Sequence, residues 1–482
     1  MQEKISVTPP LTFRRLAAFS SLGVPIAATL LPIGVYLPPY YAQTMGLGLG
    51  TVGAIFMFSR LWNALCDPIV GILSDRTRTS IGRRKPWIAA GVPLVIASVV
   101  AVFWPPDRIG ASGLSLYLAA WMFALYLGWS MVATPFYAWS GELSAQYHQR
   151  SRIQTFVQVA VASGYVLVLL IPAILDQLGP QFAHQKVAAM GTFALAALVP
   201  GLIAVLFRFR ESPVQSVSNG GASIGKSLAQ VLTSPLVLRV MGSDFFVCFG
   251  QGMRTALFVF FVTTYMGLPK WGSLLFLLQF VFGVFAGPIW LRIGYRLGKH
   301  RTVIAGEITQ ILINLSLLLV GPGQFWPLIA LTIAQGLAQG SGNLMLRAMV
   351  SDIADERRLH TGLEQSGLLF SIFNVTSNAG AAAAVGMAYP ALAWFGFQPG
   401  HTNSSAALHG LAALFALGPA FGHFFSALLI WRFPLDEKAH ALTRRALDAR
   451  DASLGAVAHA SAGLIPMALA PGIGSTAPQP ST

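Results

Sequence analysis

The feature that most constrains this chain is a succession of long apolar stretches, each about the length that crosses a lipid bilayer. A hydrocarbon layer of roughly 30 Å requires about 20 mainly apolar residues in an α-helix. Such stretches lie near 16–42, 51–74, 87–106, 114–140, 153–175, 187–207, 236–266, 272–292, 302–320, 325–350, 366–394 and 406–431. The sequence therefore predicts an all-α membrane protein with twelve transmembrane helices.

The composition supports a lipid environment for most of the surface. Hydrophobic residues make up 55% of the 482 residues and charged residues only 10%. Soluble domains carry about 25% charged residues, so a water-facing surface could not be covered by this chain. We expect a multi-pass protein that contacts the lipid bilayer.

The twelve stretches fall into two groups of six. We predict an N-terminal segment 1–15, a six-helix half 16–207, a central linker 208–234, a second six-helix half 235–432 and a tail 433–482 that is disordered from about 452. The halves echo each other, because the segments 135–152 and 346–362, at matching positions, each carry an acid at a helix end. The segments 67–87 and 287–301 form a second matching pair. Such repeats are typical of transporters whose substrate site lies between the repeats.

Basic residues are distributed unevenly between the loops of this topology. If both termini are cytoplasmic, the loops on the opposite side hold only Arg108, Lys186 and Lys270. This is the arrangement of the positive-inside rule, so we read the net charge of +14 as a topology signal. No basic run is interleaved with base-stacking aromatic residues, so we expect no nucleic-acid partner. The excess of Arg over Lys and the abundance of Ala suggest a bacterial chain, hence the inner membrane.

Motifs of enzymes are absent from the sequence. There is no phosphate-binding GxxxxGK[ST], no dinucleotide GxGxxG after a strand, no HExxH and no nucleophile elbow. The two cysteines, Cys66 and Cys248, both fall inside predicted helices and form no disulfide framework. We expect a protein that is not an enzyme and binds no cofactor or metal.

Three segments carry a family resemblance. The run DPIVGILSDRTRTSIGRRKPW (67–87) resembles the loop between helices 2 and 3 of the melibiose-permease-like glycoside–pentoside–hexuronide:cation symporters of the major facilitator superfamily. PFYAWSGELS (135–144) and SDIADERRLHTG (351–362) are similar to the helix 4–5 and helix 10–11 regions of that family. The resemblance covers nearly all of 10–435. It implies the twelve-helix major facilitator fold and cation-linked uptake of a small molecule.

Several charges that this resemblance leads one to expect are replaced. The family's two carboxylates on helix 2 fall on Asn63 and Asp67, and Thr134 stands near the place of a third. A lysine of helix 11 falls on Asn378, and an arginine of helix 5 falls on Val157. These departures favour H⁺ over Na⁺ as the coupling ion, with an uncoupled mechanism as the other possibility.

Ionisable groups deep in a membrane helix are costly and are therefore candidates for function. Arg60, Asn63 and Asp67 share one face of the second helix, where Asn63 can bond to both neighbours. We predict that Asp67 is the proton-coupling acid and that Arg60 and Asn63 set how readily it takes a proton. The alternative is a structural network that holds this helix to its neighbours.

Candidate substrate-binding residues lie on three other predicted helices. They are Tyr137, Asp244, Gln251, Arg254, Asn374 and Asn378. Arg254 can bind an anionic or hydroxyl-rich solute with its planar fork of donors, or it can neutralise a carboxylate. The resemblance puts Tyr137 where the family commonly has a tryptophan that stacks on the sugar. The alternative for all six is packing and interhelix hydrogen bonding.

Charged residues at the cytoplasmic helix ends form a further set. We predict that they are gating residues whose ion pairs close the cytoplasmic side in one state and break in the other. They are Asp75, Arg83, Arg84, Glu142, Asp352 and Glu364.

Taken together, the sequence predicts a secondary active transporter that imports a glycoside or a related polar organic solute by alternating access, coupled to protons. Its partners would be this small molecule, the coupling cation and the bilayer, and we expect a monomer. Two other hypotheses stay open. One is a carrier of an amphipathic or lipid-like substrate, and the other is a non-transporting sensor on the same scaffold.

Overall fold

A computed structural model gives the fold of the chain. It describes residues 11–106, 110–144, 147–182, 185–209, 211, 231, 233–362, 366–435, 439–450 and 452. The described residues are mainly helical and contain no strand. Most of the linker predicted at 208–234 and nearly all of the tail from 452 lie outside the described residues.

The helices of the N-terminal half follow the predicted apolar stretches. They are α1 Phe13–Ser20, α2 Gly23–Val35, α3 Leu37–Gln43, α4 Leu49–Arg76, α5 Lys85–Phe103, α6 Ala111–Glu142, α7 Tyr147–Leu178 and α8 Gln185–Arg208. The first predicted span is divided into α1, α2 and α3. Pro32 lies inside α2. Pro38 and Pro39 lie in the first turn of α3, where a missing N–H costs least.

The helices of the C-terminal half are α10 Pro235–Phe260, α11 Gly272–Leu297, α12 Lys299–Ser316, α13 Phe325–Ala338, α14 Ser341–Thr361, α15 Ser366–Trp394 and α16 Ser405–Ile430. A π-helical turn, Phe261–Tyr265, extends α10. Gly298, with φ of 79°, separates α11 from α12, and Gly362, with φ of 73°, ends α14. Both glycines adopt a left-handed conformation that favours this residue.

Among the described residues, eleven helical segments are long and apolar enough to cross a membrane. The stretch predicted at 325–350 is not one of them, because it is divided between α13 and α14. Gln339 is extended and Gly340 has φ of 91°, so the helix is interrupted between these two residues. The prediction of helical spans is confirmed, and the tenth of them is a broken helix rather than a continuous one.

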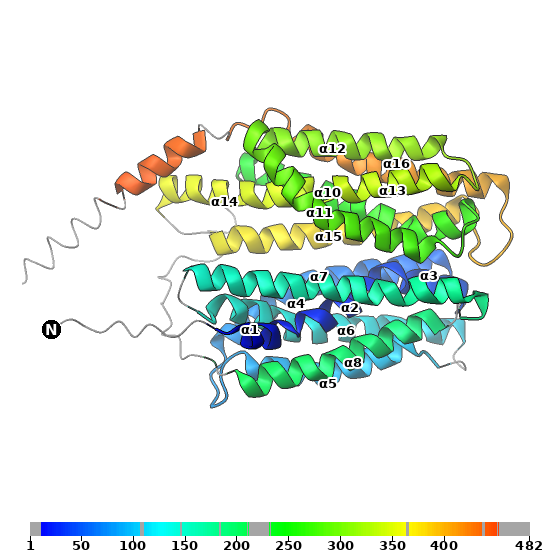
Figure 1. Cartoon of the computed structure of the whole chain (residues 1–482), viewed down its shortest axis with the longest axis horizontal. Coiled ribbons are helices and arrows are strands. Elements are labelled where there is room, and N and C mark those ends of the chain that lie inside the picture. Colours follow the sequence, from blue (N-terminus) through cyan, green and yellow to red (C-terminus); the bar gives the residue numbers. More distant parts are fainter. Residues whose placement is uncertain are drawn as a thin grey trace, which may run out of the picture.

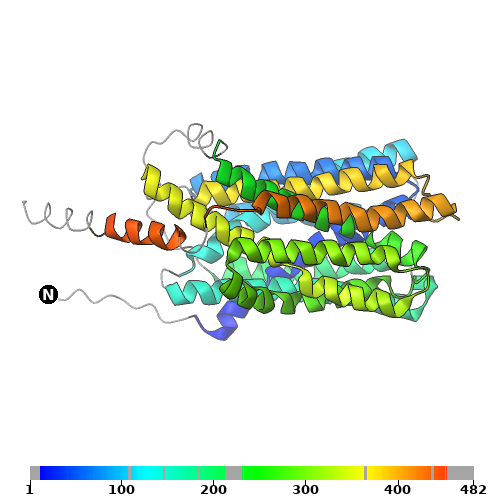
Figure 2. The same ribbon diagram turned by 90° about the horizontal axis from the view of Figure 1, so that it is seen from above.

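The helices lie in two layers that correspond to the two halves of the chain. In Figure 1, α1 to α8 form one layer and α10 to α16 form the other, with their long axes nearly parallel. The start of α1 and the helix 439–450 lie at the same end of the bundle, as Figures 1 and 2 both show. We call this end the terminal face and the other end the opposite face.

The two halves contact each other mainly through α4 with α15 and α7 with α11. Gly53 of α4 packs against Tyr389 and Pro390 of α15, and Gln177 donates a hydrogen bond of 2.8 Å to the backbone oxygen of Lys270. These contacts lie toward the opposite face. Near the terminal face, α10, α12, α14 and α15 form a buried apolar cluster of their own within the C-terminal half. The halves are therefore joined most closely at the opposite face.

Candidate functional site

Asp67 is held by the neighbouring helix α6 through hydroxyl groups. Its Oδ1 accepts a hydrogen bond of 2.6 Å from Ser130 and one of 3.2 Å from Thr134, while its Oδ2 lies 3.4 Å from the amide nitrogen of Asn63. The Ser130 hydroxyl also lies 3.2 Å from Oδ1 of Asn63. Asp67 and Asn63 are both half-buried. The predicted neighbours Asn63 and Asp67 therefore do bond to each other, one helical turn apart.

Arg60 lies outside this hydrogen-bond network. Its guanidinium approaches Gly34 of α2 and the hydroxyl of Tyr126 of α6, and it acts electrostatically on Tyr165 of α7 and Tyr389 of α15. The expectation that Asn63 bridges Arg60 and Asp67 is thus wrong in its first part. Asn63 turns to Asp67 and Ser130, and tyrosine hydroxyls surround the cation instead.

The chemistry open to Asp67 follows from its neighbours. Every hydrogen-bond partner that the structure gives it is neutral, so the described residues place no fixed cation on this carboxylate. A carboxyl group in such surroundings can take up and release a proton when its access to water changes. The described residues also contain no cluster of His, Cys, Asp or Glu that could hold a metal ion.

Asp244 forms a second polar group, in the C-terminal half. It is 1% exposed on α10 and accepts a hydrogen bond from Ser377 of α15. Arg347 of α14 is close enough to act on it electrostatically, and this exposed side chain donates a hydrogen bond of 3.2 Å to Asn374. The predicted residues Asp244 and Asn374 therefore lie around Arg347.

The remaining predicted substrate residues are dispersed over several helices. Gln251 accepts a hydrogen bond of 3.4 Å from Asn343, and Asn378 is half-buried beside Ser377. Tyr137 is 37% exposed on α6. The structure does not bring Tyr137 into a hydrogen bond with any of the others among the described residues.

Arg254 is enclosed within the C-terminal half. It is 4% exposed, donates a hydrogen bond of 3.0 Å to Asn314 of α12, and contacts Gln279 of α11 at 3.5 Å. Its guanidinium lies 5.0 Å from the ring centroid of Phe415, within the range of a cation–π interaction. These contacts favour the structural reading of Arg254 and place it on neither Asp67 nor Asp244.

Four of the predicted gating residues form one ion-pair network at the terminal face of the N-terminal half. Arg84, whose side chain is 3% exposed, contacts Glu142 at 2.6 Å and Asp75 at 3.1 Å, and Arg83 contacts Glu142 at 2.7 Å. The carboxylate of Glu211 accepts the backbone N–H groups of the same loop at 2.7 to 3.1 Å. All of these pairs lie within one half.

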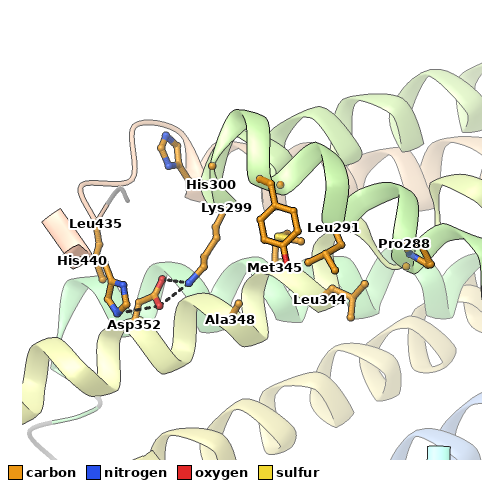
Figure 3. Close-up of a pocket in the computed structure, with 14 residues that line it drawn as sticks. Pro288, Leu291, Lys299, His300, Leu344, Met345, Ala348, Asp352, Leu435 and His440 are labelled. Carbon is orange, nitrogen blue, oxygen red and sulfur yellow. Dashed lines mark hydrogen bonds and ion pairs between the residues drawn. The ribbon is translucent and has the colours of Figure 1, made fainter. Parts of the chain in front are cut away.

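The C-terminal half has a matching ion pair. Lys299, at the start of α12, contacts Asp352 of α14 at 2.6 Å, and His440 lies 3.4 Å from the same carboxylate. A cavity of about 620 Å³ opens beside this pair, lined by apolar side chains of α11 and α14, and Figure 3 shows the pair at one end of it. This cavity lies inside the C-terminal half. The sixth gating residue, Glu364, lies outside the described residues.

Sequence reasoning missed three residues of these groups. Helical periodicity does not predict Ser130 as a partner of Asp67, and Glu211 lies in the predicted linker 208–234. Arg347 carried a detectable signal, since it is an ionisable residue inside a predicted span. The partners of these residues come from other helices, and so their roles depend on tertiary packing.

Comparison with known proteins places this geometry in a family. The family described as MFS/sugar transport protein matches residues 18–437. An uncharacterised symporter of Synechocystis is 22% identical over 93% of this chain and 98% of its own length. A glucuronide carrier protein homolog of Escherichia coli is 24% identical over 84% of this chain and 88% of its own length.

Solved structures agree on the fold. The crystal structure of the nucleoside transporter NupG aligns with a TM-score of 0.63 at 10% identity, over 87% of this chain and 98% of its own. At that identity the likeness concerns the fold alone. The two layers of membrane-spanning helices and the match over most of the chain lead to one conclusion: this protein is a membrane transporter that belongs to the MFS/sugar transport protein family.

Proposed function

We propose that this transporter imports a glycoside or a related polar organic solute by alternating access and couples the movement to protons through Asp67. The observation that carries the proposal is the set of neutral hydrogen-bond partners around this carboxylate, two hydroxyls and one amide. An acid that holds no cation changes charge when it binds a proton. That charge change is what a proton-coupled carrier requires.

The surroundings of Arg60 support a sugar-like substrate. Its guanidinium presents several donors in a plane, which suits pairs of hydroxyls or a carboxylate. The buried Tyr126 bonds to the guanidinium, and the half-buried Tyr165 adds an aromatic ring and a hydroxyl nearby. One relative is named a glucuronide carrier homolog, and a glucuronide has both a sugar ring and a carboxylate. A glucuronide is therefore the first probe to test.

We further propose that the protein works as a monomer in a bacterial inner membrane, with the terminal face in the cytoplasm. Arg83, Arg84 and Lys299 all lie at that face. Basic residues gather on the cytoplasmic side of membrane proteins, so this arrangement supports the orientation.

The test is uptake into proteoliposomes that contain the purified full-length protein. The probes are a matched set of p-nitrophenyl glycosides, namely the glucuronide, the galactoside and the xyloside, each with an imposed pH gradient or an imposed Na⁺ gradient. We expect one of them to accumulate with the pH gradient. Asp67→Asn should abolish accumulation and leave exchange of labelled for unlabelled probe intact. Asp448→Asn, at an exposed position of the helix 439–450, is the control.

Three outcomes would contradict this proposal. Accumulation that survives Asp67→Asn would remove Asp67 from coupling, and accumulation driven by Na⁺ alone would remove the proton. Transport of a lysophospholipid in the same vesicles, with no transport of any glycoside, would favour the amphipathic substrate instead.

A further inference from the structure

A buried acid and a buried histidine meet inside the C-terminal half, away from Asp67. Nδ1 of His423 in α16 lies 2.6 Å from Oε2 of Glu307 in α12, and each residue is 1% exposed. Both side chains belong to membrane-spanning helices. Polar groups at such depth are retained at a cost, and an acid–base pair is a proton-binding unit rather than ordinary packing.

The charge of this pair depends on how many protons it holds. With one proton between them, Glu307 and His423 are neutral as a pair, whichever of the two carries it. With none, the pair carries one negative charge, and with two it carries one positive charge. An apolar interior favours the neutral form, so the proton can leave only if a nearby group stabilises the remaining carboxylate.

The start of α14 is such a group. A methyl group placed on Gly342 would lie 2.5 Å from Oε1 of Glu307, so the carboxylate sits against the first turn of this helix. The N–H groups of a first turn have no partners within the helix, and the helix dipole adds partial positive charge there. This helix start lies directly after the break at Gln339 and Gly340, so α14 begins as a helix separate from α13.

α14 also places the cation Arg347 near Asp244, the second buried acid of this region. Arg347, less than two turns into α14, and Glu307 both act electrostatically on Asp244. A shift of α14 therefore changes the surroundings of Glu307 and of Asp244 together. Asp244 in turn accepts a hydrogen bond from Ser377 of α15, the helix that carries the exposed Asn374.

Other ionisable groups on the helices packed against the pair are held elsewhere. On α10, Arg239 bonds to the backbone oxygens of Leu429 and Trp431, Arg254 bonds to Asn314, and Cys248 lies beside Asp244. Lys299 and Asp352 bond to each other, Tyr389 bonds to Ala256, and His409 bonds to Ser405. The others lie in the π-helical turn or near helix ends, and they are Tyr265, Arg292, Tyr295, Arg296, His300, Arg301, Asp355, Glu356, Arg357, Arg358 and His360. α13 has none.

We propose that Glu307 and His423 form a second proton-binding site in the C-terminal half. Binding of a proton at this site and contact of Glu307 with the start of α14 oppose each other. When α14 is docked, its first turn stabilises the carboxylate and the pair releases a proton to water. When a proton binds, the carboxylate loses its charge and the helix start is free to move. This site goes beyond coupling at Asp67 and does not depend on it.

The test is hydrogen–deuterium exchange of the purified full-length protein in lipid nanodiscs, read on peptides that cover residues 335–350. After correction for the chemical exchange rate, we expect these amides to exchange about fivefold faster at about pH 5.5 than at about pH 8, the factor that a helix N-terminus gives for a nearby anion. By linkage, docking of α14 should lower the proton affinity of the pair by the same factor.

Four variants make this test specific. Glu307→Gln mimics the protonated acid, so exchange should be fast at both pH values, whereas Glu307→Asp keeps a carboxyl group and should retain the pH dependence. His423→Gln should move the midpoint of the transition. His409→Gln, an exposed histidine on the same helix, is the matched control and should resemble wild type. Size-exclusion profiles verify that each variant is folded.

The proposal is wrong if wild type has no pH dependence at these peptides, or if the dependence persists in Glu307→Gln. Asp67→Asn should leave the exchange response unchanged. If Asp67→Asn abolishes it, the second site is not independent. If instead coupling through Asp67 fails in the vesicle assay and the exchange response persists, only the proposal for Asp67 is overturned.

Discussion

Replacing Ser130 by alanine removes the shortest hydrogen bond to the Asp67 carboxylate, at 2.6 Å. A hydrogen bond to a charged group stabilises it by about 1.5–3 kcal/mol. The bond from Ser130 is stronger to the ionised carboxylate than to the protonated acid. One pH unit corresponds to about 1.4 kcal/mol, so the midpoint of the pH profile of uptake should move up by about 1–2 units. Thr134→Val removes a bond of 3.2 Å and should give a smaller shift in the same direction.

The assay is initial uptake of the transported glycoside into proteoliposomes over a series of equal internal and external pH values. Thr192→Val is the control, because among the described residues the hydroxyl of Thr192 bonds to a backbone oxygen of its own helix, α8, and to no side chain. Unchanged midpoints in Ser130→Ala and Thr134→Val would refute the reasoning, since they would mean that Asp67 does not set the pH profile. A larger shift in Thr134→Val than in Ser130→Ala would refute the ranking by distance.

Three further predictions concern the same helices. Asn63→Asp restores a second carboxylate one turn from Asp67, and uptake should then respond to a Na⁺ gradient, measured in the same vesicles. Gly422→Ala would put a methyl group 2.6 Å from a backbone oxygen of α10 and should cost about 1–3 kcal/mol, seen as a lower Tm in detergent. Glu142→Gln leaves the buried guanidinium of Arg84 with a weaker partner and should cost about 1–3 kcal/mol, less than a fully buried pair because Glu142 is one-third exposed. Asp448→Asn, which breaks an exposed pair, should leave Tm unchanged.

Most of the fold can be predicted from the sequence, because long apolar runs have few alternatives in lipid. The stretch predicted at 51–74 is α4 Leu49–Arg76, and the one at 272–292 begins where α11 begins. The break before α14 could not be predicted in this way. Gly336, Gly340 and Gly342 lie within seven residues of each other, so hydropathy gives no sign of which glycine adopts the left-handed conformation.

For the candidate site, contacts along one helix could be predicted from the sequence, whereas contacts between helices could not. Helical periodicity put Asn63 and Asp67 on one face, and they do bond to each other. The same periodicity also put Arg60 on that face, yet its side chain finds Tyr126, because the choice among partners is made by packing between helices. Thr134 stands near the place of a family carboxylate, and in the structure its hydroxyl donates a hydrogen bond to Asp67.

Each half has its own ion pair at the terminal face, at matching positions, but the buried polar groups inside the two halves differ. This difference bears on how each half could serve transport. Arg84 with Glu142 and Lys299 with Asp352 join matching helices, so these pairs give neither half a distinct role. Asp67 is half-buried, so in the proposed cycle its proton would exchange with water as the halves move. Glu307, at 1% exposure, can exchange a proton only if a helix moves away from it. A proton at Asp67 would thus report which side is open, whereas a proton at Glu307 would report whether α14 is docked.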